Sequence, residues 1–352
     1  MTGGAILPML AVFLPTQVLF GTATGAFLVR MMATAKWPDW ALLLLGIGLA
    51  PCLVTLVLYY SLWLFPGLPH GMAIFAVVAF FVLLGGAAGQ GWLAWRRLFL
   101  QCRNLRYDRS MWLFALCTLG FMVLAVVKLL TAPLTEHDIL EYAVQGHVFL
   151  RDMAITYQPH HYDAATGFYY VGLHGFSFPL LFTWEGLVWP EAWTLSNPWV
   201  RVLTPFYAWL IVALGWGLMR RVGRWFAVWF VLALGGAMGF FFLGTVYHLD
   251  AMRIFLFAGV VVLLTQAISD PRPAIIGLLG VVCAAGAGVH SLSAILACLV
   301  GLVLTALMEG GMMRRLGAAL CFGLAFLLAG GIHYPVDVFL GTGWIFKDIV
   351  WY

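Results

Sequence analysis

Long apolar stretches alternate with short polar ones along almost the whole chain. Ten of these stretches approach the length that an α-helix needs to cross about 30 Å of hydrocarbon. They lie near residues 5–29, 41–64, 72–95, 111–131, 199–219, 225–244, 251–268, 274–288, 290–308 and 316–332. The eighth is short and could merge with the ninth. The pattern predicts about ten transmembrane helices.

The composition points to the same class of protein. The 352 residues are 64% hydrophobic and only 9% charged, whereas about a quarter of a soluble domain is charged. We therefore predict an all-α polytopic membrane protein. The net charge of +4 makes no basic patch, so nucleic acid is not an expected partner. The N-terminal run lacks a basic leader and is expected to stay as a spanning helix rather than be cleaved as a signal.

Basic residues orient the predicted helices. Thirteen of the eighteen lysines and arginines fall in turns that share one side, which the positive-inside rule makes cytoplasmic. They are Arg30, Lys36, Arg96, Arg97, Arg103, Arg106, Arg109, Arg220, Arg221, Arg224, Arg272, Arg314 and Arg315. Most carboxylates and all nine histidines fall at or near the opposite face. We expect the N-terminus and the polar chemistry on the extracytoplasmic side.

A long segment, 132–198, is predicted to form one outer loop. Within it, 176–189 is apolar but carries Pro179 and Glu185, and a crossing there would move the basic residues after 219 to the outside. We therefore interpret 176–189 as an interfacial helix with its tryptophans at headgroup level. A loop of this length is usually functional.

The loop opens with a dense group of ionisable residues, TEHDILEYAVQGH at 135–147. On a helix that restarts at Thr135, the side chains of Asp138, Glu141 and Tyr142 share one face, at positions i, i+3 and i+4. The alternative is a solvated helix whose acids only keep it in water. His160, His161 and Asp163 could form a metal site only if the loop folded them together.

A second acidic group follows in YHLDAMR at 247–253. His248 and Asp250 are expected at the outer mouth of a helix, with Arg253 one turn inside the apolar span. An arginine in a membrane span is a functional-site hypothesis by default, and the alternative is an anchor that reaches the headgroups.

Five features in this order resemble the GT-C superfamily of integral membrane glycosyltransferases, which includes protein O-mannosyltransferases and aminoarabinose transferases. They are the acidic loop motif PLTEHDILEY, the aromatic segment LHGFSFPLLFTW, the arginine-led helix RVLTPFYAWLIVALGWGLMRRVGRW, the acid-ended LGTVYHLDAMRIFLF and the small-residue GVVCAAGAGVHSLSAI. The likeness covers 111–332 and implies a seven-helix core. Residues 1–100 are then an added three-helix bundle, and 333–352 an outer segment that could continue beyond Tyr352.

The resemblance implies transfer of a sugar from a polyprenyl-phosphate carrier to a lipid, glycan or protein acceptor on the outer face. Asp138 corresponds to the loop carboxylate that acts as base, and Asp250 to the second acid. These two carboxylates could also hold a divalent cation. The remaining candidates would bind donor or acceptor: Glu141, Tyr142, His174, Arg201, His248, Arg253, His290 and His333, with Lys128 as a further cation.

Two other functions fit the composition. A transporter would also gather polar residues, but it should have midplane charges and repeated halves, and no internal repeat is apparent. A non-catalytic subunit of a membrane complex could have kept the fold without catalysis. The six cysteines lack metal-binding spacing and are expected to be packing residues.

Overall fold

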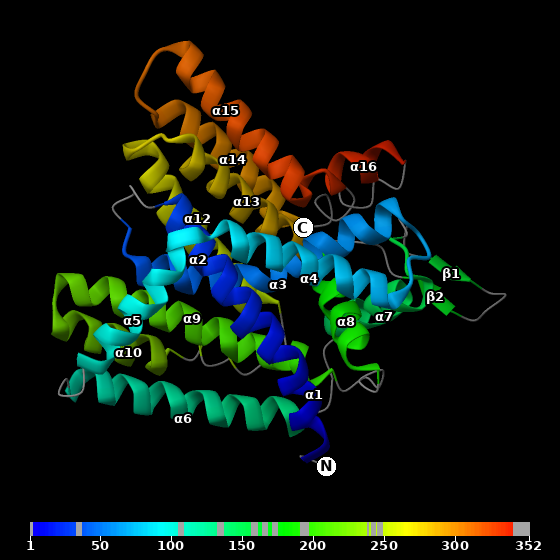
Figure 1. The fold of residues 1–352 in the computed structure, drawn as a ribbon, viewed down its shortest axis with the longest axis horizontal. Coiled ribbons are helices and arrows are strands. Elements are labelled where there is room, and N and C mark those ends of the chain that lie inside the picture. The colour runs from blue at the N-terminus through cyan, green and yellow to red at the C-terminus, as the bar shows by residue number, and fades with distance from the viewer. Residues whose placement is uncertain are drawn as a thin grey trace. The chain divides into compact units, whose positions relative to one another are not determined.

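A computed structural model confirms the helical, multi-pass membrane class. It describes residues 3–32, 37–104, 109–131, 137–155, 161–163, 168–170, 175–190, 197–237, 239–240, 244 and 249–340. Helices dominate these residues, and a single antiparallel pair of three-residue strands interrupts them (Figure 1).

Seven helices in the described part of the chain are long and apolar enough to cross a membrane. They cover Ile6–Met31, Asp39–Leu64, His70–Ala87, Trp112–Thr131, Pro198–Val222, Asp250–Ser269 and Met312–Gly331. Three shorter apolar helices, α10 (Arg224–Gly236), α13 (Pro273–Val289) and α14 (Leu292–Leu307), coincide with the other three predicted runs. The longest of these has 17 residues, which is about 25 Å against about 30 Å of hydrocarbon. Ten crossings therefore remain a prediction.

The chain forms two compact units that are interleaved in sequence. One comprises 1–50, 79–136 and 191–255, and the other 51–78, 137–190 and 256–352. Three long helices pass from one unit to the other, α3 (Asp39–Leu64), α4 (His70–Ala87) and α12 (Asp250–Ser269). The boundaries predicted from the sequence, 1–100, 111–332 and 333–352, do not coincide with these units.

Small residues let backbones approach closely in the first unit. Its other elements are α1 (Gly3–Phe13), the π-helical η1 (Leu14–Phe20), α2 (Gly21–Met31), the 3-10 turn η2 (Gly89–Trp92), α5 (Leu93–Asn104), α6 (Arg109–Thr131), α9 (Pro198–Val222) and α10. A Cβ atom on Gly46 of α3 would overlap the backbone of Gly25 in α2. Such close approach is how helices pack when lipid gives them no hydrophobic drive to associate.

Aromatic side chains join the remaining helices of the first unit. α6 packs along α9, and α10 folds back on both (Figure 1). The rings of Phe114 and Trp216 stack with centroids 4.7 Å apart. The buried indole of Trp199 donates a hydrogen bond to the Gln17 side-chain oxygen at 3.0 Å. This bond satisfies a polar group in an otherwise apolar contact.

The second unit contains the long predicted loop and the C-terminal helices. Its further elements are α7 (His137–Asp152), β1 (His161–Asp163), β2 (Phe168–Tyr170), α8 (Ser177–Val188), α13, α14, α15 (Met312–Phe326), the π-helical η4 (Leu327–Gly331) and α16 (His333–Phe339). α13 packs against α14 and α15 (Figure 1). Its small residues allow this, because Gly280 faces the backbone of Phe322.

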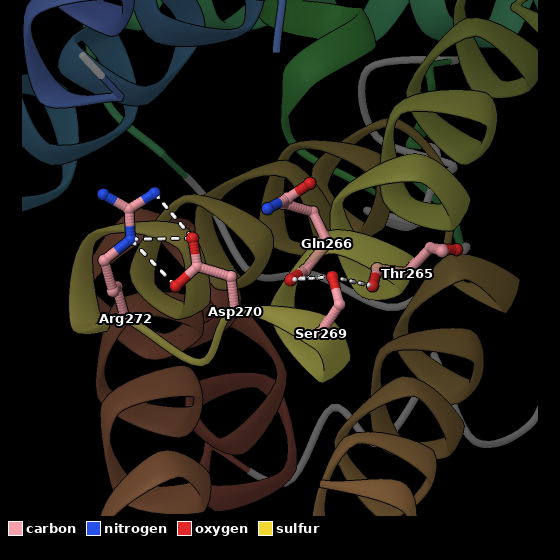
Figure 2. A network of polar contacts seen from close by, with 5 residues as sticks. All are labelled: Thr265, Gln266, Ser269, Asp270 and Arg272. Carbon is pink, nitrogen blue, oxygen red and sulfur yellow. Dashed lines mark hydrogen bonds and ion pairs between the residues drawn. The ribbon is translucent and has the colours of Figure 1, made fainter. Parts of the chain in front are cut away.

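The turn between α12 and α13 is closed by a local ion pair (Figure 2). The Nε atom of Arg272 lies 3.0 Å from each carboxylate oxygen of Asp270. The Ser269 hydroxyl donates back to the carbonyl of Gln266 at 3.1 Å, which is one of the last four carbonyls of α12. Proline at 271 and 273 ends one helix and starts the next.

Helix α8 is the segment that was expected to lie at the lipid surface, and in the structure it is enclosed by protein. All residues from Ser177 to Leu187 are buried, whereas an interfacial helix would leave one face open. The helix is indeed short, with 12 residues, or about 18 Å. Gly146 of α7 lies against the Pro179 backbone, and Gly186 faces Leu150. The apolar surface of α8 therefore packs against other helices of the protein.

A kink at η4 directs the chain into α16. Gly330 has φ 108°, a left-handed value that glycine adopts at little cost. The kink leaves helix carbonyls without their usual donors, and the Tyr60 hydroxyl donates to that of Leu328 at 3.0 Å. A Cβ atom at Gly330 would press on the ring of Phe176.

Replacing Gly330 by alanine should therefore destabilise the second unit. Left-handed backbone costs a non-glycine residue about 1–2 kcal/mol, and displacement of Phe176 adds to this. We expect a lower melting temperature in detergent. Gly323→Ala is the matched control, because nothing lies within 4 Å of the added Cβ. Equal melting temperatures for both variants would contradict the role of the kink.

Candidate functional site

A cluster of buried polar and aromatic side chains lies in the second unit around α16. His333 and Asp337, one helical turn apart, have exposed fractions of 0% and 2%. The imidazole of His333 meets the ring of Tyr59 edge-on at 6.0 Å and that of Phe176 at 5.7 Å. Tyr59 stacks on Phe176 at 4.3 Å. We call His333, Tyr334, Asp337, Tyr142 and Tyr59 the α16 cluster.

Tyr334 links this cluster to the end of α13. Its hydroxyl donates a hydrogen bond to the Ala287 carbonyl at 2.6 Å. Burial, and then the charges of Asp337 and Tyr142, raise the pKa of Tyr334 well above its usual range. The phenol is therefore held neutral, as a hydrogen-bond donor, beside a carboxylate.

Tyr142 brings α7 to the same cluster. It is 6% exposed, and its ring meets Phe178 of α8 edge-on at 5.3 Å. One turn later, Gln145 is 5% exposed, and its Oε1 atom accepts no hydrogen bond from the residues that the structure describes. A buried amide oxygen without a donor costs about 1–3 kcal/mol. A hydroxyl-rich ligand could satisfy it.

The predicted base lies at the start of the same helix. Asp138 is the second residue of α7, although its side chain lies outside the described residues. The first turn of a helix favours a negative charge by about 0.3–1 kcal/mol. Glu141 follows in the next turn and is partly buried. The predicted face of Asp138, Glu141 and Tyr142 therefore falls on a helix, with Tyr142 turned into the protein.

Three predicted residues belong to the first unit. Asp250 opens α12, and its carboxylate lies 3.4 Å from Nη2 of Arg253. Arg201 is 8% exposed and donates to the carbonyl of Leu129, in the last turn of α6, at 2.9 Å. Arg201 thus caps carbonyls that α6 cannot satisfy itself. The predicted approach of Asp138 to Asp250 stays a prediction.

The structure places the predicted histidines in different environments. His290 ends α13 in extended conformation, and its Nδ1 atom accepts a hydrogen bond from the Leu292 amide at 3.1 Å. His333 lies in the α16 cluster. His174, His248 and His160 lie outside the described residues, as do the side chains of His161 and Asp163. Within the described part, no three His, Cys, Asp or Glu side chains are grouped as metal ligands.

Sequence reasoning selected two members of the α16 cluster, Tyr142 and His333, and missed the others. The missed signal was the run HYPVD at 333–337, which puts His333 and Asp337 on one face at i and i+4. That run belongs to the predicted outer C-terminal segment, 333–352. The electrostatic influence of Tyr142 on Tyr334 joins residues almost two hundred positions apart and has no local pattern.

The fold and the cluster define a multi-pass helical membrane protein with a buried His–Tyr–Asp group. Comparison with known proteins does not assign the chain to a family, because no protein-family model, no curated protein and no solved structure matches it.

The buried imidazole predicts a loss of stability in acid. Burial lowers the pKa of His333 to about 3, against about 6.5 in an unfolded chain. The folded state therefore keeps the neutral form, and stability is full above pH 6.5 and falls as the pH drops toward 3. From pH 8 to pH 5 we expect the free energy of unfolding to decrease by about 2 kcal/mol from this group.

Unfolding in detergent at both pH values measures this change. His333→Phe removes the titrating group while keeping a ring among Tyr59 and Phe176, so its stability should depend less on pH. Asp337→Asn, measured in parallel, shows how much of the pH dependence comes from the neighbouring carboxylate. An equal pH dependence in wild type and His333→Phe would contradict the assignment.

Proposed function

We propose that the protein is a membrane glycosyltransferase that moves a sugar from a polyprenyl-phosphate donor to an acceptor on the extracytoplasmic face. The observation that carries the proposal is the position of α7. Its first turn bears Asp138, and the next bears Tyr142, which packs on Phe178 of α8 and raises the pKa of Tyr334 in α16. Ionisable groups enclosed in a membrane protein are costly and generally functional.

The chemistry assigned to these residues is a single displacement with inversion. The Asp138 carboxylate takes the proton of the acceptor hydroxyl while the hydroxyl oxygen attacks the anomeric carbon. The bond from that carbon to the phosphate oxygen breaks, and polyprenyl phosphate leaves with the electron pair. Arg253 is the proposed contact for the donor phosphate, before and during the transfer. Asp250, its ion-pair partner, is proposed to orient the acceptor.

The α16 cluster and Gln145 fit the binding of a sugar. Gln145 offers a buried acceptor oxygen, and the Tyr334 hydroxyl, whose one proton goes to the Ala287 carbonyl, is a second acceptor. Sugar hydroxyls can donate to both oxygens.

Asp138→Asn should abolish transfer and leave folding intact. Asparagine keeps the size of aspartate but cannot accept the proton, and loss of a general base typically lowers the rate by about 10²–10⁴-fold. The assay follows transfer from a polyprenyl-phosphate sugar in liposomes, beside a melting-temperature measurement. Glu141→Gln, one turn away on the same helix, is the comparison and should lower the rate less than Asp138→Asn, because Glu141 is proposed to bind substrate and not to take the proton.

Near wild-type turnover by Asp138→Asn would exclude this residue as the base. No transfer by the wild type from any polyprenyl-phosphate sugar tested would favour the non-catalytic membrane subunit.

Arg253→Ala should act mainly on the donor. Loss of a phosphate contact present in ground and transition states should raise the donor KM more than it lowers kcat. Asp250→Asn is the comparison, because it breaks the same 3.4 Å ion pair and leaves the arginine in place. If Asp250→Asn gives the same rise in donor KM, Arg253 acts through the ion pair and not through the donor phosphate.

A further inference from the structure

A cavity of about 740 Å³ in the first unit is lined by three arginines. Arg30 comes from the end of α2, whereas Arg96 and Arg97 come from α5. None of the residues to which glycosyl transfer is assigned lines this cavity. All three arginines are exposed, and three guanidinium groups around one cavity repel each other unless an anion joins them.

The cavity has a fixed frame. Its floor is the η2 turn, in which Gly89 has φ 51° and a Cβ on Gly91 would overlap the Ala26 carbonyl. The indole of Trp95 donates to the Thr22 carbonyl at 3.1 Å, and the Arg30 side chain donates to the Ala87 carbonyl. The start of α5 is therefore held against α2, and the arginines project from a rigid base.

One arginine is already partly neutralised. Arg97 lies 2.8 Å from the carboxylate of Asp39, and both side chains are largely exposed, at 61% and 38%. An ion pair this exposed contributes little to stability. Arg96 lines the same cavity without such a partner among the described ion pairs. The cavity therefore keeps a positive charge that suits a phosphate group.

Apolar side chains surround the charges. Leu93, Arg96, Arg97 and Leu100 share one face of α5 at i, i+3, i+4 and i+7. Leu93 is 51% exposed and Leu100 40%, and the neighbouring Phe99 is 73% exposed. A helix with arginines and exposed aliphatic and aromatic side chains is suited to the boundary between headgroups and acyl chains. A soluble anion would need the arginines but not this apolar surface.

We propose that this cavity, which we call the Arg30–Arg96 pocket, binds the phosphate headgroup of an anionic phospholipid, with the acyl chains along α5. The three arginines belong to the basic set that the sequence assigns to the cytoplasmic face. That leaflet carries the anionic lipids, and each arginine near it gains about 1 kcal/mol. The lipid would be a bound structural or regulatory ligand and not the sugar donor.

Binding is measured on the full chain by native mass spectrometry with phosphatidylglycerol and phosphatidylcholine as probes. We expect tighter retention of phosphatidylglycerol. Arg96→Gln should weaken it about fivefold, the equivalent of about 1 kcal/mol per arginine. Arg103→Gln is the matched control, since Arg103 is exposed on the same helix but does not line the cavity. Equal effects of the two variants would overturn the pocket assignment.

Asp39→Asn gives a test of opposite sign. It frees Arg97 for the lipid and should tighten binding of phosphatidylglycerol, whereas Arg97→Gln should weaken it. If both variants weaken binding equally, the ion pair only maintains the fold and the proposal fails. Inorganic phosphate is the last probe. If it saturates the site at low millimolar concentration while the two lipids are retained equally, the ligand is a soluble anion and the lipid assignment is wrong.

Discussion

Backbone and side-chain polar groups that leave water in this protein must find partners inside it, because hydrocarbon offers none. Much of the structure follows from this constraint. The π-helical kink at η4 frees carbonyl groups, and the Tyr60 hydroxyl occupies one of them. The last turn of α6 has carbonyls without amides, and Arg201 occupies that of Leu129. The Tyr334 hydroxyl does the same for Ala287. Polar side chains are thus placed where helices end or bend.

The need to pair buried polar groups also explains why three arginines have different roles. Arg201 is buried and its Nη1 group donates to a helix end, so this donor already serves the fold. Arg253 is about one-third exposed and forms an i, i+3 ion pair with Asp250 at 3.4 Å. Arg96 lines a cavity beside exposed leucines. Sequence reasoning treated the first two alike, because an arginine in an apolar span looks the same whichever neighbour it meets.

Hydropathy was sufficient to predict which apolar runs form helices, but not what those helices pack against. The ten predicted runs correspond to seven long and three short apolar helices, because the length of an apolar run is a local property. The location of α8 could not be predicted in this way. Apolar residues suit lipid and protein equally, and only the small residues Gly146 and Gly186 indicated close packing. The two interleaved units likewise depend on contacts between distant segments, of which the sequence gives no sign.

The candidate site shows the same division between local and distant information. The helical face of Asp138, Glu141 and Tyr142 is a local pattern, and α7 does begin at His137. Tyr142 packs on Phe178 of α8 and raises the pKa of Tyr334 in α16, and no spacing rule connects residue 142 to residue 334. A transporter would be expected to place such charges at the middle of its spanning helices. Here His333 and Asp337 stand beyond the last long span, Met312–Gly331, and Asp250 opens another. Polar chemistry at the ends of helices suits a reaction in which a lipid-borne group meets a water-borne acceptor, because the reacting bond must lie near the headgroups.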